Sequence, residues 1–295
     1  AEIAAISTTC MREGIVLYDA DGNEIWACAN VDARSSDEVA ELIQMNPELE
    51  KEIYSISGQT YALGALPRLL WVKNKMPEVY KKVAKVSMFN DWLIYKLSGV
   101  LATEPSNGCT TGIFNLNERT WDTSIAEKCG LRSDIFPEVY ECGSIVAKVS
   151  AKGAAETGLA EGTIIVAGGG DAQLGCIGIG VVDKNQAAIF GGSFWQYEFN
   201  TDSGATDSGC RVRVNCHAVP QMWQYEALAF KPGLVMRWFR DAFCHLEKKI
   251  GENTGRDPYY LMDKEAEKIP AGSYGMMCAF SDIMNYISWK HCSPT

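Results

Sequence analysis

The sequence predicts an α/β fold in two domains, and three observations support this prediction. Its 295 residues are enough for about two domains of roughly 150 residues each. Short β-rich runs open the chain, and amphipathic helical patterns follow them. An apolar strand at 163–167 then opens into a glycine turn, and the stretch at 186–195 repeats this strand-and-glycine pattern. We place the domain junction close to residue 180, with domains over 1–180 and 181–295.

The first elements are strands. Runs at 2–8, 14–18 and 24–28 are rich in β-forming residues. The segment DADGN, at 19–23, has the Asp-Gly chemistry of a tight turn. We therefore expect an antiparallel meander at the start of the chain.

Helical patterns come next. The stretch 35–45 begins with serines that can cap a helix, and it places Val39, Leu42 and Ile43 at helical spacing. The stretch 76–86 has a proline at its first helical position. The stretch 90–99 ends in a glycine suited to a C-cap. All three are predicted helices around an α/β core.

The remaining predictions concern the last part of the chain and its two ends. The stretch 233–243 has a helical pattern, and 269–282 is expected to be a loop that leads into a new strand. The chain opens without Met and stops at HCSPT, so we expect it to be cut at both ends.

Charge and composition exclude some partners. The net charge of −10 argues against a surface that binds nucleic acid or an anionic membrane. No uninterrupted apolar run is long enough to span a membrane, and we expect no secretory leader. The eleven cysteines show no paired two-residue spacing, which favours reduced thiols in a cytoplasmic protein.

A lone acid, Asp171, follows three glycines at the end of the 163–167 strand. Glycine lets the backbone approach a substrate closely, so this carboxylate could act as a base for a hydroxyl. The alternative is a turn aspartate that accepts a hydrogen bond from its own backbone.

Two pairs of an Arg and an acid follow predicted strands, the first between two strand-like runs and the second after 24–28. Arg12 and Glu13 could bind the hydroxyls of a polyol, or they could form an exposed ion pair. Asp32 and Arg34 could orient that first pair.

The other candidate binding residues have weaker support from the sequence. The turn Gly191, Gly192 and Ser193 could hold phosphate oxygens with its backbone N–H groups, or it could be a plain β-turn. A metal site at Cys210, Cys216 and His217 is disfavoured by their spacing, and the three histidines share no catalytic spacing. The tryptophans at 195, 223 and 238 could stack on a ligand, although core positions are more usual.

Taken together, the motifs resemble the FGGY family of sugar kinases. Matching strings in family order include REGIVLYDADGNEIWACANVDAR, NDWLIYKLSG, PSNGCTTGIFNLNERTWD, GGGDAQLGCIGIG and FGGSFW. Within the family, CMREGIVLYD and GLVMRWFRDAFC are most similar to the autoinducer-2 kinase branch. The resemblance implies a ribonuclease H-like fold, of the actin, hexokinase and Hsp70 type, with most of the first domain and the start of the second.

The resemblance also implies an activity and roles for residues. It implies an ATP- and Mg²⁺-dependent kinase that phosphorylates a terminal hydroxyl of linear dihydroxypentanedione. Asp171 would be the base, with Arg12, Glu13, Asp171 and Gln173 binding the sugar and Gly191, Gly192 and Ser193 binding ATP phosphates. The partners would be a sugar or polyol and ATP, and a homodimer is compatible with the sequence.

Some features depart from the family pattern. The Asp-Gly-Thr phosphate loop and the adenosine-binding glycine motif are not found in these residues. Glu104 stands where relatives often have Asp, and Gly191, Gly192 and Ser193 stand where many have Gly-Thr-Gly. Two alternatives therefore stay open: a kinase for xylulose, glycerol or another polyol, and a truncated, non-catalytic sugar-binding relative.

Overall fold

The computed structural model describes residues 3–61, 64–192, 195–229 and 232–277. The chain divides into two compact units. The first holds the described residues up to Ala188 together with Glu198–Ala227. The second holds Ile189–Tyr197 and the described residues from Leu228 onward.

A hairpin extended by a third strand forms one sheet of the first unit. Strand β3 (Ile15–Tyr18) pairs antiparallel with both β4 (Glu24–Cys28) and β5 (Lys85–Met88). The turn between β3 and β4 is closed by the Asp19 carboxylate, which accepts hydrogen bonds from the backbone of Asp21 and Asn23. This confirms the predicted hairpin over 14–28.

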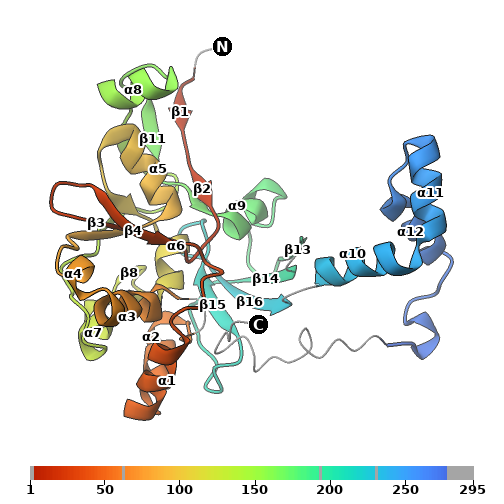
Figure 1. Cartoon of the computed structure of the whole chain (residues 1–295), viewed down its shortest axis with the longest axis horizontal. Coiled ribbons are helices and arrows are strands. Elements are labelled where there is room, and N and C mark those ends of the chain that lie inside the picture. The colour runs from red at the N-terminus through yellow and green to blue at the C-terminus, as the bar shows by residue number, and fades with distance from the viewer. Residues whose placement is uncertain (1–2, 62–63, 193–194, 230–231, 278–295) are drawn as a thin grey trace. The chain divides into compact units, whose positions relative to one another are not determined.

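The first predicted strand has a different partner. Within the predicted run 2–8, only β1 (Ala5–Ile6) is a strand, and a second short strand, β2 (Thr9–Cys10), follows the run. They pair in parallel with β11 (Ile164–Val166) and β12 (Gly169–Gly170). The predicted meander is therefore wrong at its first strand, because the partner lies about 160 residues away and no local turn specifies it. Figure 1 shows β1 and β2 running past β11 toward α9.

The other strands form small sheets. Strand β10 pairs antiparallel with β11, β6 pairs in parallel with β9, and β7 pairs with β8, while the order β13-β14-β16-β15 describes a four-stranded sheet. Their bounds are β6 Ala102–Thr103, β7 Phe114–Asn115, β8 Thr120–Trp121, β9 Glu138–Val139, β10 Ile145–Lys148, β13 Ala187–Gly191, β14 Trp195–Thr201, β15 Arg213–Cys216 and β16 Trp223–Ala229.

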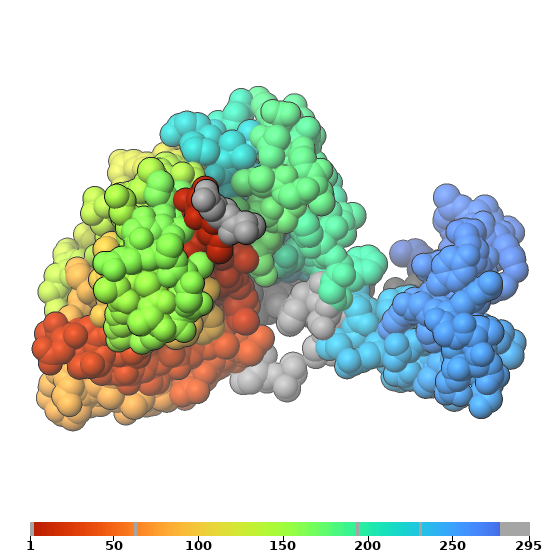
Figure 2. Space-filling model, turned by 90° about the horizontal axis from the view of Figure 1, so that it is seen from above, coloured from red at the N-terminus to blue at the C-terminus, as the bar shows by residue number. Residues whose placement is uncertain are grey.

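Helices fill the connections of the first unit. Their bounds are α1 Ser36–Met45, α2 Leu49–Ser57, α3 Ala65–Lys75, α4 Pro77–Tyr80, α5 Phe89–Ser98, α6 Pro105–Gly108, η1 Cys109–Thr111, α7 Thr123–Lys128, α8 Ala151–Thr157 and α9 Asp171–Gly178. The space-filling view shows the red N-terminal residues lying against the green residues around 150 (Figure 2).

Helix predictions at 35–45 and 90–99 are confirmed, the second with Gly99 as a left-handed C-cap. The serine cap of α1 is wrong, since Ser35 makes no capping bond and the Ser36 hydroxyl donates to the Ala33 carbonyl at 2.7 Å. The predicted helix over 76–86 is only partly correct. It ends at Tyr80, because the following residues pair with β3 as strand β5.

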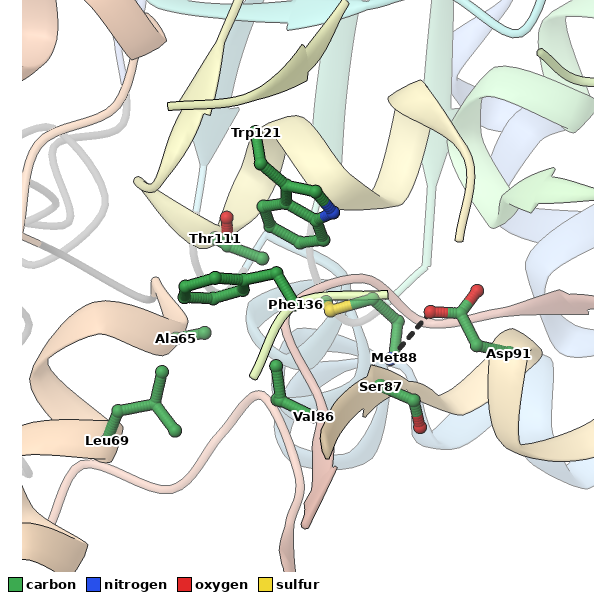
Figure 3. Close-up of a pocket in the computed structure, with 9 residues that line it drawn as sticks. All are labelled: Ala65, Leu69, Val86, Ser87, Met88, Asp91, Thr111, Trp121 and Phe136. Atoms are coloured by element: carbon green, nitrogen blue, oxygen red, sulfur yellow. Dashed lines mark hydrogen bonds between the residues drawn. The ribbon is translucent and has the colours of Figure 1, made fainter. Parts of the chain in front are cut away.

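The main core lies between the β4-β3-β5 sheet and helices α1 to α3. Ile15, Leu17, Leu69 and Val72 are fully buried there. A small cavity of about 10 Å³, which is room for about one water molecule, lies beside this core. Figure 3 shows Asp91 at its edge, bonded to the backbone N–H of Met88 at 2.8 Å.

The second unit contains three helices among its described residues. They are α10 (Pro232–Phe243), α11 (His245–Thr254) and α12 (Pro258–Ala266), followed by the short η2 (Ser273–Gly275). Helix α10 confirms the prediction for 233–243, and the strand expected to follow 269–282 lies outside the described residues. In the described part of the chain, every helix is too short or too polar to cross a bilayer.

Candidate active site

Two neighbouring parallel strands bring the predicted acid and the predicted Arg and Glu pair to one edge. Strand β2 ends at Cys10 and is followed by Arg12 and Glu13. Strand β12 ends at Gly170 and is followed directly by Asp171, the first residue of helix α9. Since parallel strands end on the same edge of a sheet, residues far apart in sequence meet there. This edge is the candidate active site.

Glycines make this close approach feasible. A side chain on Gly168 would meet the Thr8 carbonyl oxygen at 1.6 Å. A side chain on Gly170 would lie 2.6 Å from the Gln173 amide oxygen and 2.8 Å from Arg12 Cγ. Because glycine has no Cβ, β12 can lie against β2, and Arg12 and Gln173 can both approach its end.

Glu104 stabilises the turn before Asp171 through Ser106. This carboxylate caps helix α6 by accepting hydrogen bonds from the backbone N–H groups of Ser106 and Asn107. The Ser106 hydroxyl donates to Glu104 at 2.6 Å and accepts from the Gly170 N–H at 2.9 Å. Glu104 therefore fixes the backbone that carries the candidate base.

Asp171 is exposed, and one of its oxygens is engaged. Its Oδ1 accepts a hydrogen bond from the Ala172 N–H at 2.9 Å, as the turn interpretation expected. Partial desolvation raises the pKa of Asp171 above its ordinary value, and the nearby Arg12 guanidinium opposes this shift. The bond to Ala172 leaves Oδ2 as an acceptor for a hydroxyl.

Arg12 and Glu13 are buried, at 3% and 4% exposure, so they do not form the exposed ion pair considered above. Each has a partner from the β15-β16 hairpin. Arg12 pairs with Glu226, and Glu13 Oε1 accepts from Arg213 Nη2 at 2.7 Å.

The backbone of Glu13 is unusual. Its φ of 67° lies in the left-handed region, which residues other than glycine rarely adopt. The Arg68 guanidinium holds this conformation by donating to the Glu13 carbonyl at 2.7 Å and to the Asp32 carbonyl at 3.1 Å. Non-glycine residues in this region cluster at functional sites.

The Asp32 and Arg34 side chains pair with each other, at 2.7 Å, rather than with Arg12 or Glu13. Arg34 also lies over the Trp26 and Trp71 rings. The link from this segment to Glu13 runs through the Asp32 carbonyl and Arg68 instead.

Unpartnered polar atoms lie beside Asp171. Among the described residues, both amide atoms of Gln173 and the Nη1 of Arg12 are buried without a hydrogen-bond partner. Buried polar groups are normally satisfied, so such atoms are suited to a ligand that carries donors and acceptors. A polyol has both.

The other candidates belong to other elements of the chain. Gly191 ends strand β13 and Gly192 is exposed, whereas Ser193 lies outside the described residues. Trp223 is a core residue whose indole N–H donates to the Leu116 carbonyl at 2.7 Å, but Trp195 and Trp238 are 42% and 54% exposed.

The cysteine and histidine cluster does not form a metal site. Across the described ranges, no three His, Cys, Asp or Glu side chains are arranged to hold a metal ion. The His217 Nδ1 accepts from the Val219 N–H, and burial lowers the pKa of this ring to about 4. A neutral, structurally bonded imidazole is the result.

Sequence reasoning missed the partners on β15 and β16. Arg213 faces Glu226 directly across the antiparallel pair, and both are at most 2% exposed. A charged residue inside each of two otherwise apolar or neutral strands was the available signal. It had the same form as the signal that identified Asp171.

Curated relatives match the chain along its whole length. The autoinducer-2 kinases of an Enterobacter species and of Klebsiella pneumoniae are each 49% identical over 296 residues, covering 100% of this chain and 56% of the relative. The chain thus spans about half the length of these relatives.

Solved structures share the fold. The xylulose kinase and the gluconate kinase of Lactobacillus acidophilus each match with a TM-score of 0.80 at 21% identity, covering 94% of this chain and 54% of theirs. These neighbours confirm the predicted ribonuclease H-like fold. Residues 1–178 match the sequence model described as the N-terminal domain of the FGGY family of carbohydrate kinases. The chain belongs to the FGGY family of carbohydrate kinases.

Proposed function

We propose that this chain is part of an ATP-dependent kinase that phosphorylates the terminal hydroxyl of linear dihydroxypentanedione. The observation that carries the proposal is the meeting of Asp171 with Arg12 and Glu13 at the ends of β12 and β2. The name of the relatives at 49% identity supports this substrate among the sugars that the family phosphorylates. A cytoplasmic location, where ATP is available, is part of the same proposal.

Asp171 acts as the general base. Its Oδ2 accepts the proton of the attacking hydroxyl, while Oδ1 stays bonded to the Ala172 N–H and fixes the carboxylate plane. The unpartnered atoms of Arg12 and Gln173 bind other hydroxyl or carbonyl oxygens of the sugar. Glu13 accepts from a further hydroxyl. The side chains thus position the nucleophile, which provides much of the catalysis in phosphoryl transfer.

The nucleotide would be held by backbone groups. Gly191, the last residue of strand β13, and Gly192, which follows it, are exposed and have no Cβ to keep phosphate oxygens away from their N–H groups. Ser193 is the third residue proposed for this role, and it lies outside the described residues. ATP would supply the phosphoryl group, and Mg²⁺ would neutralise the charge on its phosphates. A magnesium ion held largely by substrate phosphates would need few protein carboxylates.

The test is Asp171→Asn in the full-length protein that carries this sequence. Asparagine keeps the acceptor for Ala172 but is a poor base, so turnover should fall by about a hundredfold or more while sugar binding is kept. Asp21→Asn, in the exposed β3-β4 turn, is the matched control. Rates would be measured by ATP consumption and product mass on dihydroxypentanedione, xylulose and glycerol.

Each outcome decides between functions. Near-normal turnover of Asp171→Asn would show that Asp171 is not the general base. If the unchanged protein prefers xylulose or glycerol, the proposed substrate is wrong, although the protein is still a kinase. Absence of turnover on every sugar would favour the non-catalytic relative.

A further inference from the structure

We propose that Glu226 is the positioning residue of the sugar site, holding Arg12 directly and Glu13 through Arg213, while its neighbour Glu198 carries a proton. This inference rests on the proposed function for its kinetic consequences. Its geometric part concerns residues of the first unit alone.

Glu226 uses its two oxygens for two arginines. Its Oε2 pairs with Arg12 Nη2, and its Oε1 lies 3.1 Å from Arg213 Nη1. The second terminal nitrogen of Arg213, Nη2, donates to Glu13 Oε1 at 2.7 Å. One carboxylate at the centre of β16 therefore sets the place of both side chains that follow β2.

The hairpin itself is anchored against the first part of the chain. Arg213 Nε donates to the Gln59 side-chain oxygen at 2.9 Å. The Gln59 amide nitrogen donates in turn to the Val214 carbonyl at 2.9 Å and to Asn215 at 3.0 Å. This fixes the Arg213 guanidinium, so Glu13 is held by a rigid donor rather than by a mobile side chain.

The charges of the buried side chains in this group balance only if a third buried carboxyl is neutral. Arg12 and Arg213 carry two positive charges, and Glu13 and Glu226 carry two negative ones. Glu198 is also fully buried beside Glu226. Among the described residues, neither of its oxygens has a donor, so an ionised Glu198 would be an unsatisfied buried charge.

A protonated Glu198 avoids this cost, because its O–H group can donate a hydrogen bond to Glu226. Burial and the charge of Glu226 hold the pKa of Glu198 well above its usual range. Burial would also raise the pKa of Glu226, but Arg12 and Arg213 outweigh it and hold that pKa below its usual range. Two adjacent carboxyls thus have different protonation states.

The two carboxyls allow a matched test in the full-length protein. Glu226→Gln removes the charge that faces both arginines, whereas Glu198→Gln replaces one neutral group by another of the same shape. Two readouts are taken: the KM and kcat for the sugar that the unchanged protein phosphorylates best, and the guanidinium NMR signals of isotope-labelled arginine. Thermal melting shows whether each variant is folded.

We expect Glu226→Gln to raise KM by about tenfold or more, with a smaller change in kcat. It should remove the restrained signal of Arg12 and shift that of Arg213, which Gln59 and Glu13 still hold. Glu198→Gln should keep the KM within about twofold and keep both signals. Should Glu226→Gln fail to fold, Arg213→Lys replaces it. A lysine keeps the positive charge but cannot contact Glu13 and Glu226 at the same time, as the planar guanidinium does. KM should therefore rise while the Arg12 signal remains.

The opposite results overturn the inference. The first is a folded Glu226→Gln variant with a normal KM and both arginine signals. The second is an equal rise in KM and equal loss of arginine signals in Glu226→Gln and Glu198→Gln. If the unchanged protein phosphorylates no sugar, the proposed function fails, and the arginine signals alone still decide the positioning role.

Discussion

At the scale of single residues, the candidate site combines Asp171, the proposed base, with buried partners. Asp171 is exposed and Arg12 is 3% exposed, yet they interact electrostatically. Desolvation stabilises the protonated form of Asp171, and Arg12 stabilises the ionised form, so the raised pKa is the balance of the two. The ionised form is the one that acts as a base.

A pH profile tests this balance. Activity should fall as the pH drops through the raised pKa of Asp171, because the carboxyl then keeps its proton. Arg12→Met removes the opposing charge, so the acid limb of kcat/KM should move to higher pH, in addition to any loss of affinity.

The control is Arg34→Met, since Arg34 pairs with Asp32 and not with the site. The acid limb of its kcat/KM profile should stay at the same pH. If the acid limb of Arg12→Met is also unchanged, Arg12 does not lower the pKa of Asp171.

At the scale of elements, the pairing of β2 with β12 determines where the site forms. The Gly169 N–H donates to the Thr8 carbonyl at 3.3 Å, and the Thr9 hydroxyl donates to the Gly169 carbonyl at 3.0 Å. There is no space between these strands for a Cβ on Gly168. The start of helix α9, and with it Asp171, therefore depends on one glycine.

Gly168→Ala should separate the two strands, because its Cβ would lie 1.6 Å from the Thr8 oxygen. We expect a lower melting temperature and loss of turnover. Gly178→Ala, at the other end of α9, meets nothing within 4 Å and should keep both, with a small gain from helix propensity. Equal stability of the two alanine variants would contradict this view of the pairing.

Local chemistry explains which elements were predictable. The β3-β4 hairpin and the end of α5 depend on nearby turn and cap residues, Asp19 and Gly99, and both were predicted. The parallel partner of β1 and the strand that interrupts the 76–86 helix depend on distant residues. The candidate residues Arg12, Glu13 and Asp171 came from motifs, but their partners Arg213 and Glu226 carried no motif and became visible only through the fold.

At the scale of the whole molecule, a buried acid links stability to pH. Asp91 is fully buried beside the cavity, and burial raises its pKa to about 8 (Figure 3). The unfolded chain has an ordinary aspartate pKa of 3.8, so between these values the folded state holds a proton that the unfolded state has lost. Stability is therefore lost as the pH rises through this window.

Asp91→Asn should remove this dependence while keeping the acceptor for the Met88 N–H. Relative to the unchanged protein, its free energy of unfolding should rise by about 1.4 kcal/mol for each pH unit between roughly pH 5 and 8. Urea unfolding at three pH values measures this. Asp134→Asn, an exposed partner of Arg132, should show a constant difference over the same range, and the same result for Asp91→Asn would exclude a protonated Asp91.

The pairing of Glu13 with Arg213 and of Arg12 with Glu226 joins residues 200 and 214 positions apart. Those partners lie beyond residue 178, where the match to the N-terminal family domain ends. A chimaera of two relatives with its crossover anywhere between these segments would mix arginines and glutamates of different parents. Exchange of sugar preference between relatives would therefore require the β15-β16 hairpin to be inherited together with the residues that follow β2.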